Sequence, residues 1–236
     1  MKKEYGFILI TYIVMQLSSF IGVPLMSMIG ARFGLEEGFS VSAWLVLSFI
    51  AALIITLFLL RKEMNGSVRN NGALPLSKSA AWAVGGIFLA LMAQSIAGSI
   101  EYLMGIEIGS ENTQQIINLI KTAPIIIIIS SIIGPILEEV VFRKVIFGSL
   151  YKRFNFFLAG LISSLIFAFA HGEPEHLLLY SAMGFTFAYL YVKTKRILVP
   201  IFAHVSMNTI VVVLQLNQDK IQQFQQLQSF IGGYFN

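Results

Sequence analysis

The sequence has 236 residues, of which 56% are hydrophobic and 12% are charged, and its mean hydropathy is +0.78. Because an ordinary soluble domain carries about 25% charged residues, this composition excludes a soluble protein and indicates one that crosses a membrane several times. The lack of cysteine excludes a disulfide framework, a thiolate metal site and a cysteine nucleophile, and the single aspartate, Asp219, excludes an aspartyl dyad.

Several apolar segments approach the length of about 20 residues that a membrane-spanning helix needs. They predict an all-α fold, a polytopic bundle of about seven transmembrane helices. The first segment follows two lysines and is not followed by a small-residue cleavage site, so we interpret it as an anchor and not as a removable signal. The segments are 6–29, 40–60, 80–104, 122–148, 156–171, 176–192 and 197–214.

The charges between these segments predict the orientation of the chain. With the N-terminus in the cytoplasm, the inner segments hold eleven lysines and arginines and the outer segments three. This bias follows the positive-inside rule. The net charge of +4 therefore indicates topology and contact with anionic lipid, not binding of nucleic acid. We expect a multi-pass protein of a bacterial plasma membrane.

Three regions are expected along the chain. A three-helix membrane region occupies 1–120, a core that carries the polar motifs occupies 121–214, and a tail occupies 215–236. In the tail, apolar residues recur at helical spacing among glutamines, which is typical of an amphipathic helix at the membrane interface. A frayed tail is the alternative. The recurring residues are Ile221, Phe224, Leu227 and Ile231.

Polar side chains inside the apolar segments are candidates for function, because burying them in lipid is costly. Two of the polar residues have simpler explanations. Glu101, near the outer end of its segment, fits an interfacial carboxylate, and His176, in a loop, fits a solvated side chain. The remaining candidates are Glu138, Glu139, Arg143, His171, His204 and Asn208.

The adjacent glutamates differ in what they face. Glu139 and Arg143 are four residues apart and share a helix face, so Arg143 can neutralise Glu139. Glu138 points elsewhere and is free for chemistry as a general base or acid. The alternative is a structural one, in which Glu139 and Arg143 form a buried ion pair and the carboxylate of Glu138 extends to the water at the membrane surface.

The short loop after 150 makes the fourth and fifth segments an antiparallel hairpin, which places Glu138 and His171 at the same height.

His204 and Asn208 are also four residues apart and share a face of the last segment. Alone, they would fit a satisfied hydrogen-bonding pair between helices. Together with Glu138 and His171 they favour a catalytic site.

Three motifs in chain order resemble a known family of membrane proteases. Residues 138–143 read Glu-Glu-x-x-x-Arg, residues 167–171 read Phe-x-x-x-His, and residues 204–208 read His-x-x-x-Asn. This set is similar to that of the CAAX-processing and bacteriocin-processing membrane proteases, the type II CAAX prenyl endopeptidase-like or Abi proteins. The resemblance extends over about residues 120–212. It implies an intramembrane endopeptidase whose substrate is a peptide or membrane protein.

The resemblance implies two mechanisms. In the favoured one, Glu138 and His171 activate a water while His204 and Asn208 stabilise the oxyanion, and no cofactor is needed. In the other, Glu138, His171 and His204 bind a zinc ion. In both, Glu139 and Arg143 support the site. The alternatives in other classes are a catalytically silent scaffold or bacteriocin-immunity protein that uses the same polar cavity and, third, a carrier for small solutes.

Overall fold

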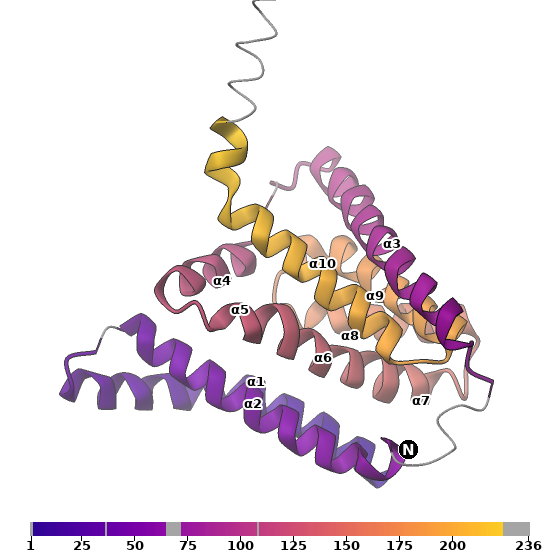
Figure 1. The fold of residues 1–236 in the computed structure, drawn as a ribbon, viewed down its shortest axis with the longest axis horizontal. Coiled ribbons are helices and arrows are strands. Elements are labelled where there is room, and N and C mark those ends of the chain that lie inside the picture. The colour runs from indigo at the N-terminus through magenta and orange to yellow at the C-terminus, as the bar shows by residue number, and fades with distance from the viewer. Residues whose placement is uncertain (1, 36, 65–71, 108, 224–236) are drawn as a thin grey trace, which may run out of the picture.

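The structure, a computed structural model, describes residues 2–35, 37–64, 72–107 and 109–223. These residues form helices and turns and no strand, which confirms the all-α prediction (Figure 1). The α-helices are α1 (Lys3–Arg32), α2 (Glu37–Met64), α3 (Leu76–Leu103), α4 (Glu111–Thr122), α5 (Ile126–Ile128), α6 (Gly134–Glu138), α7 (Gly148–Leu150), α8 (Phe156–Phe169), α9 (Leu177–Thr194) and α10 (Leu198–Leu216). Two π-helical segments, η2 (Ile129–Ile133) and η3 (Glu139–Phe147), and the 3-10 turn η4 (Pro174–His176) complete the fold.

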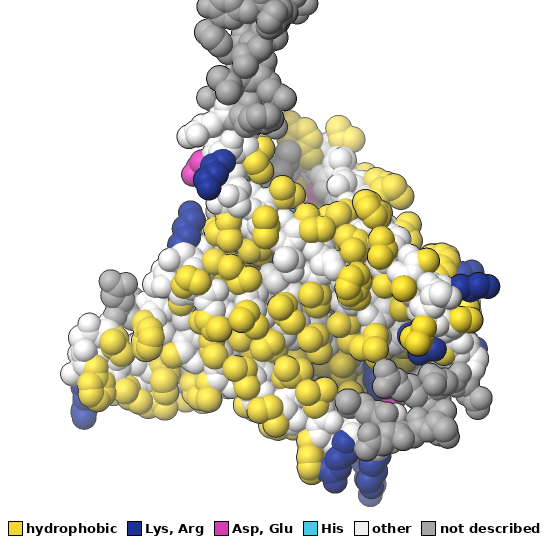
Figure 2. Space-filling view, viewed as in Figure 1, with side chains coloured by type: hydrophobic (Ala, Val, Ile, Leu, Met, Phe, Trp, Pro, Cys, Tyr) yellow, Lys and Arg dark blue, Asp and Glu magenta, His cyan; other side chains and the backbone are white. Residues whose placement is uncertain are grey.

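The predicted number of seven spans is not confirmed. Within the described residues, four helices are long and apolar enough to cross a membrane: α1, α2 (from Gly38 to Glu63), α3 and α10. The fourth predicted segment is divided among α5, η2, α6, η3 and α7, and α8 has only 14 residues. At about 1.5 Å per residue, α8 is shorter than the hydrocarbon core. Apolar side chains nevertheless cover the middle of the face in Figure 2, with lysine and arginine at its margins.

Helices α1 and α2 form an antiparallel pair along one side of the bundle (Figure 1). Gly22 makes their close approach possible, because a Cβ at this position would lie 1.8 Å from the Trp44 ring. The Trp44 indole also donates a hydrogen bond to Ser18 Oγ at 3.2 Å. At the far end of the pair, Lys2 Nζ lies 2.6 Å from Glu63 Oε1.

The predicted hairpin of the fourth and fifth segments is confirmed. Asn155 begins α8 by accepting a hydrogen bond from the Leu158 N–H, and α8 then runs back along η3. The Ser163 hydroxyl donates to the Phe142 carbonyl at 2.8 Å, and the rings of Phe142 and Phe167 meet edge to face. Helix α9 packs against α8 and α3, and α10 packs against α3 and α9.

Helix α4 was not expected from the sequence, and the predicted tail helix lies partly outside the described residues. Helix α4 occupies a stretch for which no element was predicted. Its cap is Ser110, whose side chain accepts a hydrogen bond from the Thr113 N–H. The tail is described to residue 223, and residues 218–223 are helical. Of the apolar residues in the predicted tail helix, Phe224, Leu227 and Ile231 lie outside the described residues.

Candidate active site

The glutamate pair lies where the fourth segment changes from α-helix to π-helix. Pro135, in the first turn of α6, has no N–H, and a proline ring clashes with the carbonyl four residues earlier in a regular α-helix. That earlier residue, Ser131, lies in η2, whose wider π-helical turns differ from the regular geometry. Glu138 ends α6 and Glu139 begins η3. Such π-helical insertions are frequent at functional sites.

Glu139 and Arg143 form the predicted ion pair. Arg143 Nε lies 3.2 Å from Glu139 Oε2, and both side chains are buried. The guanidinium carbon lies 4.2 Å from the centroid of the Phe167 ring and 5.3 Å from that of Phe187. Aromatic faces attract cations, so the two rings help to hold the buried guanidinium. The prediction that Arg143 neutralises Glu139 is therefore confirmed.

His204 lies between the two glutamates. Its Nδ1 is 2.9 Å from Glu139 Oε1, and its Nε2 is 3.7 Å from Glu138 Oε2. The imidazole is buried and stacks on the Phe187 ring at 4.5 Å. Glu139 thus holds His204 as well as Arg143, a contact between α10 and η3 that the spacing of residues along one helix could not predict. Glu138 keeps about a fifth of its side chain exposed.

His171 lies just after α8, in the turn that Gly172 completes with a φ of +74°. Its Nδ1 is 2.8 Å from the Phe167 carbonyl oxygen. Because a carbonyl oxygen only accepts hydrogen bonds, Nδ1 carries a proton and Nε2 is the acceptor nitrogen of the neutral ring. The His171 ring stacks on that of Tyr180, with centroids 4.0 Å apart.

The structure brings the predicted site residues together to different degrees. Glu138, Glu139, Arg143 and His204 are joined by ion pairs. Phe167 packs against the rings of both His171 and His204, with centroids 4.4 and 6.1 Å away, although no hydrogen bond or ion pair links Glu138 to His171 among the described residues.

Asn208 lies one helical turn after His204 on α10 and is partly buried. Helix α10 contacts both α6 and η2, the segments that lead to Glu138. The side-chain amide of Asn208 has no hydrogen-bond partner in the part of the chain that the structure describes, so the N–H groups of this amide are available as donors.

The residues proposed as zinc ligands fit a metal ion only in part. Glu138 and His204 converge to 3.7 Å, a separation that one ion could bridge. However, no group of three His, Cys, Asp or Glu side chains within the described ranges lies close enough to hold an ion. His171, the third proposed ligand, does not complete the set in this arrangement.

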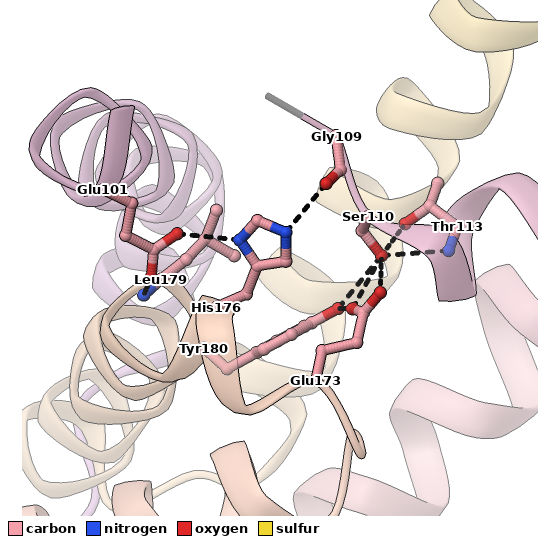
Figure 3. Close-up of polar contacts among 8 residues, drawn as sticks. All are labelled: Glu101, Gly109, Ser110, Thr113, Glu173, His176, Leu179 and Tyr180. Atoms are coloured by element: carbon pink, nitrogen blue, oxygen red, sulfur yellow. Dashed lines mark hydrogen bonds and ion pairs between the residues drawn. The ribbon is translucent and has the colours of Figure 1, made fainter. Parts of the chain in front are cut away.

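A second polar cluster, shown in Figure 3, was not predicted. His176 is buried, with Nδ1 2.9 Å from Glu101 Oε2 and Nε2 2.8 Å from the Gly109 carbonyl oxygen. Both partners are acceptors, so only the protonated imidazolium satisfies both contacts. The prediction of a solvated His176 was therefore wrong. Glu101 is also buried, not exposed at the interface, and its Oε1 accepts a hydrogen bond from the Leu179 N–H at 2.8 Å.

Comparisons with known proteins identify the family. Residues 120–210 match the family described as type II CAAX prenyl endopeptidase Rce1-like. The chain is also 51% identical over 243 aligned positions, covering all of both chains, to the protein named membrane peptidase YdiL of Bacillus subtilis (strain 168). The chain belongs to the Rce1-like CAAX protease family. The resemblance inferred from the three motifs is thereby confirmed.

A second relative of the chain is the protein named membrane-embedded CAAX protease MroQ of Staphylococcus aureus (strain USA300). The two are 36% identical over 199 residues, which is 81% of each chain. No solved structure matches the chain. All three motifs, residues 138–143, 167–171 and 204–208, lie within the part that matches the Rce1-like family.

Proposed function

We propose that this member of the Rce1-like CAAX protease family is an intramembrane endopeptidase that hydrolyses a peptide bond of a membrane-associated peptide or protein. The family match supports a protease, and the relatives named as a membrane peptidase and a membrane-embedded protease support the same activity. The apolar helices around the polar motifs support a site that meets its substrate in the bilayer.

The observation that carries the proposal is the position of His204 between Glu138 and Glu139. Glu139 accepts a hydrogen bond from Nδ1, which leaves Nε2 directed toward Glu138. With Nδ1 donating to Glu139, Nε2 can donate as well when both ring nitrogens carry a proton. In that form Nε2–H is a donor beside a partly exposed carboxylate, an arrangement suited to an oxyanion next to a general base.

In the proposed reaction, Glu138 and His171 activate a water molecule. The carboxylate of Glu138 takes a proton from the water, and the water oxygen forms a bond to the carbon of the scissile carbonyl. His171 Nε2, the acceptor nitrogen, orients the water. When the bond from carbon to nitrogen breaks, the proton held by Glu138 passes to the leaving amine.

His204 and Asn208 stabilise the oxyanion of the tetrahedral intermediate by donating hydrogen bonds to it. Removing one such preorganised donor costs about 10²- to 10³-fold in turnover in other hydrolases. Glu139 and Arg143 act indirectly, since Glu139 fixes the ring of His204 and Arg143 balances the charge of Glu139.

We propose that the protein lies in a bacterial plasma membrane and that its substrate reaches the site from within that membrane. The N-terminus lies in the cytoplasm, as the distribution of lysine and arginine predicts. The partners are the lipid bilayer and a peptide or protein substrate, and nucleic acid has no role. In this proposal residues 1–120 form a membrane region, residues 121–214 form the catalytic core, and residues 215–236 form a tail.

The test combines peptide cleavage with metal analysis. Wild-type protein and the variants Glu138→Gln, His171→Ala and His204→Ala are reconstituted in vesicles with internally quenched peptides that carry apolar segments. Each is assayed with and without chelator, and Glu175→Gln serves as a control because Glu175 is exposed. We expect cleavage that survives chelator and is lost in Glu138→Gln.

Two results would contradict the proposal. Stoichiometric zinc that is lost in His204→Ala, together with chelator-sensitive cleavage, would make these residues zinc ligands. Failure of folded wild-type protein to cleave any of the peptides would favour a scaffold.

A further inference from the structure

The imidazole of His171 is positioned by few contacts from its own segment. His171 lies two residues after the end of α8, and the hydrogen bond from Nδ1 to the Phe167 carbonyl is the one polar contact of its imidazole within the described residues. That bond allows the ring to pivot about it. A base that must meet a water molecule needs a second constraint, because small displacements of a reacting group are costly to the rate.

Tyr180 supplies a second contact. Its ring is stacked on the His171 ring, with centroids 4.0 Å apart and planes 25° from parallel. Phe167 packs against the imidazole as well, at 4.4 Å and nearly edge-on. The imidazole is therefore held between Phe167 on α8 and Tyr180 on α9.

Glu173 fixes Tyr180. The Tyr180 hydroxyl donates a hydrogen bond to Glu173 Oε2, as Figure 3 shows. The same carboxylate accepts hydrogen bonds from Ser110 Oγ at 2.8 Å and from the Asn112 N–H at 2.9 Å. Both Glu173 and Tyr180 are buried. The position of the Tyr180 ring is thus set by a carboxylate that is itself tied to the first turn of α4.

Glu101 fixes the turn of α9 that carries Tyr180. Leu179 is the residue before Tyr180, and its N–H donates a hydrogen bond to the Glu101 carboxylate. The same carboxylate pairs with His176. A carboxylate at a helix N-terminus satisfies a free N–H group and interacts favourably with the helix dipole. Two buried carboxylates from different segments therefore determine where the Tyr180 ring lies.

We infer that Tyr180, held by Glu173, is a positioning residue for the His171 imidazole. The inference rests on the proposed function for its catalytic consequence, but the position of the ring can be measured without any substrate. Tyr180 does not contact the reacting atoms; it acts by limiting the rotation of His171.

The first test observes the histidines directly. The chain has three histidines, His171, His176 and His204, so the full-length protein labelled with isotopic histidine gives few imidazole signals, and single substitutions assign them. A stacked aromatic ring shifts the proton resonances of His171. We expect Tyr180→Leu to abolish this shift and Tyr180→Phe to retain part of it. We expect Glu173→Gln, which weakens the hold on the tyrosine, to reduce it.

The second test measures cleavage. Tyr180→Leu should lower kcat by about 10- to 100-fold with little change in KM, because the bound substrate is unaffected while the base is misplaced. Tyr180→Phe should restore most of the activity. Tyr189→Leu is the matched control, since Tyr189 lies on the same helix and packs against Trp82, away from His171.

The outcomes separate the inference from the proposed function. An unchanged His171 signal in folded Tyr180→Leu protein would overturn the positioning role, whatever the activity. A His171 signal that also moves in Glu173→Gln, which keeps the Tyr180 ring but loosens its hold, would support the positioning role. If folded wild-type protein cleaves no peptide, that result contradicts the protease and leaves the position of the ring as measured. Equal losses of kcat in Tyr180→Leu and Tyr189→Leu would also overturn the inference, since they would indicate a general effect on α9.

Discussion

At the scale of single residues, the buried charges determine how the site is built. Arg143 and Glu139 lie in the protein interior, where each would be costly without the other. Glu139 also fixes His204. One carboxylate thus neutralises a cation on its own helix and orients a predicted catalytic ring on another.

Loss of the Glu139 charge should destabilise the protein strongly. The variant Glu139→Gln leaves the Arg143 guanidinium buried without its counter-charge, which costs about 3 to 5 kcal/mol in comparable pairs. Thermal unfolding in detergent measures the change. Glu63→Gln is the matched control, because Glu63 pairs with Lys2 and Lys144 but is partly exposed, and pairs of that kind contribute about 1 kcal/mol or less. Equal decreases of the unfolding temperature in Glu139→Gln and Glu63→Gln would contradict a special role for the buried Glu139 charge.

The carboxylate of Glu173 should make stability depend on pH. Burial acts to raise the pKa of Glu173, but the hydrogen bonds from Tyr180, Asn112 and Ser110 and the charge of His176 outweigh it and hold the pKa below its ordinary value. A lowered native pKa stabilises the fold above the ordinary pKa of glutamate, near pH 4, and this contribution is lost as the pH falls through the native value.

The variant Glu173→Gln tests this dependence. We expect its Tm to lie below that of the wild type at neutral pH, with the gap closing on acidification below about pH 4. Tyr180 and His176, the other titratable groups that face Glu173, have raised pKa values, so both keep their protons as the pH falls through about 4. A difference in Tm between wild type and Glu173→Gln that stayed constant with pH would show that the Glu173 carboxylate does not cause the pH dependence. The same pH-dependent difference in the exposed control Glu175→Gln would show this too.

At the scale of elements, the motifs were predictable and their surroundings were not. The spacing of Glu139 and Arg143 was enough to pair them, and the length of the loop after 150 was enough to make the hairpin. The π-helical turns of η2 and η3 were not predictable, because a pattern of apolar residues does not distinguish a widened helix from a regular one. Helix α4 carried a readable signal in Ser110 and Ile116, Ile117 and Ile120, a cap followed by apolar residues at helical spacing.

Helices α8 and α9 should tolerate no added side chain at Gly184. A Cβ there would lie 3.0 Å from Ser164 Cβ and 3.1 Å from its Cα, so the two helices would have to separate. We expect Gly184→Ala to destabilise the protein by about 1 to 3 kcal/mol, measured by thermal unfolding.

The control for this variant is Gly85→Ala, because a Cβ at position 85 on α3 meets nothing within 4 Å. Alanine has the higher helix propensity, so this variant should be stabilised by up to about 1 kcal/mol. A Gly184→Ala protein as stable as Gly85→Ala would show that α8 and α9 are not closely packed at this position.

At the scale of the whole molecule, the sequence predicted the class of fold and the residues of the candidate site, because apolar composition and motif spacing are local properties. The cluster of Glu101, Glu173 and His176 was missed, since its contacts join residues more than 60 positions apart. The available signal was weak: Glu101 was predicted near the outer end of its segment and His176 in a loop, and no spacing pattern joined them. The predicted number of about seven spans was not confirmed, because π-helical turns and the short α8 interrupt the regular helix lengths in the described residues.

The predicted orientation can be tested by single cysteines, since the native chain has none. Lys152→Cys lies in the turn before α8, and Glu107→Cys follows α3; both positions are exposed. With a cytoplasmic N-terminus, a membrane-impermeant maleimide should label Glu107→Cys in intact cells and Lys152→Cys only after permeabilisation. The reverse pattern, or labelling of both from one side, would contradict the proposed topology.

The most direct test of the account is the turnover of Glu138→Gln in vesicles. Glutamine keeps the shape of the side chain but cannot accept the proton of water, so we predict a loss of at least about 10²-fold in kcat. The unfolding temperature should stay near that of the wild type, because Glu138 is partly exposed and has no counter-ion on its own helix among the described contacts. Turnover of the folded variant close to that of the wild type would contradict the central role of Glu138.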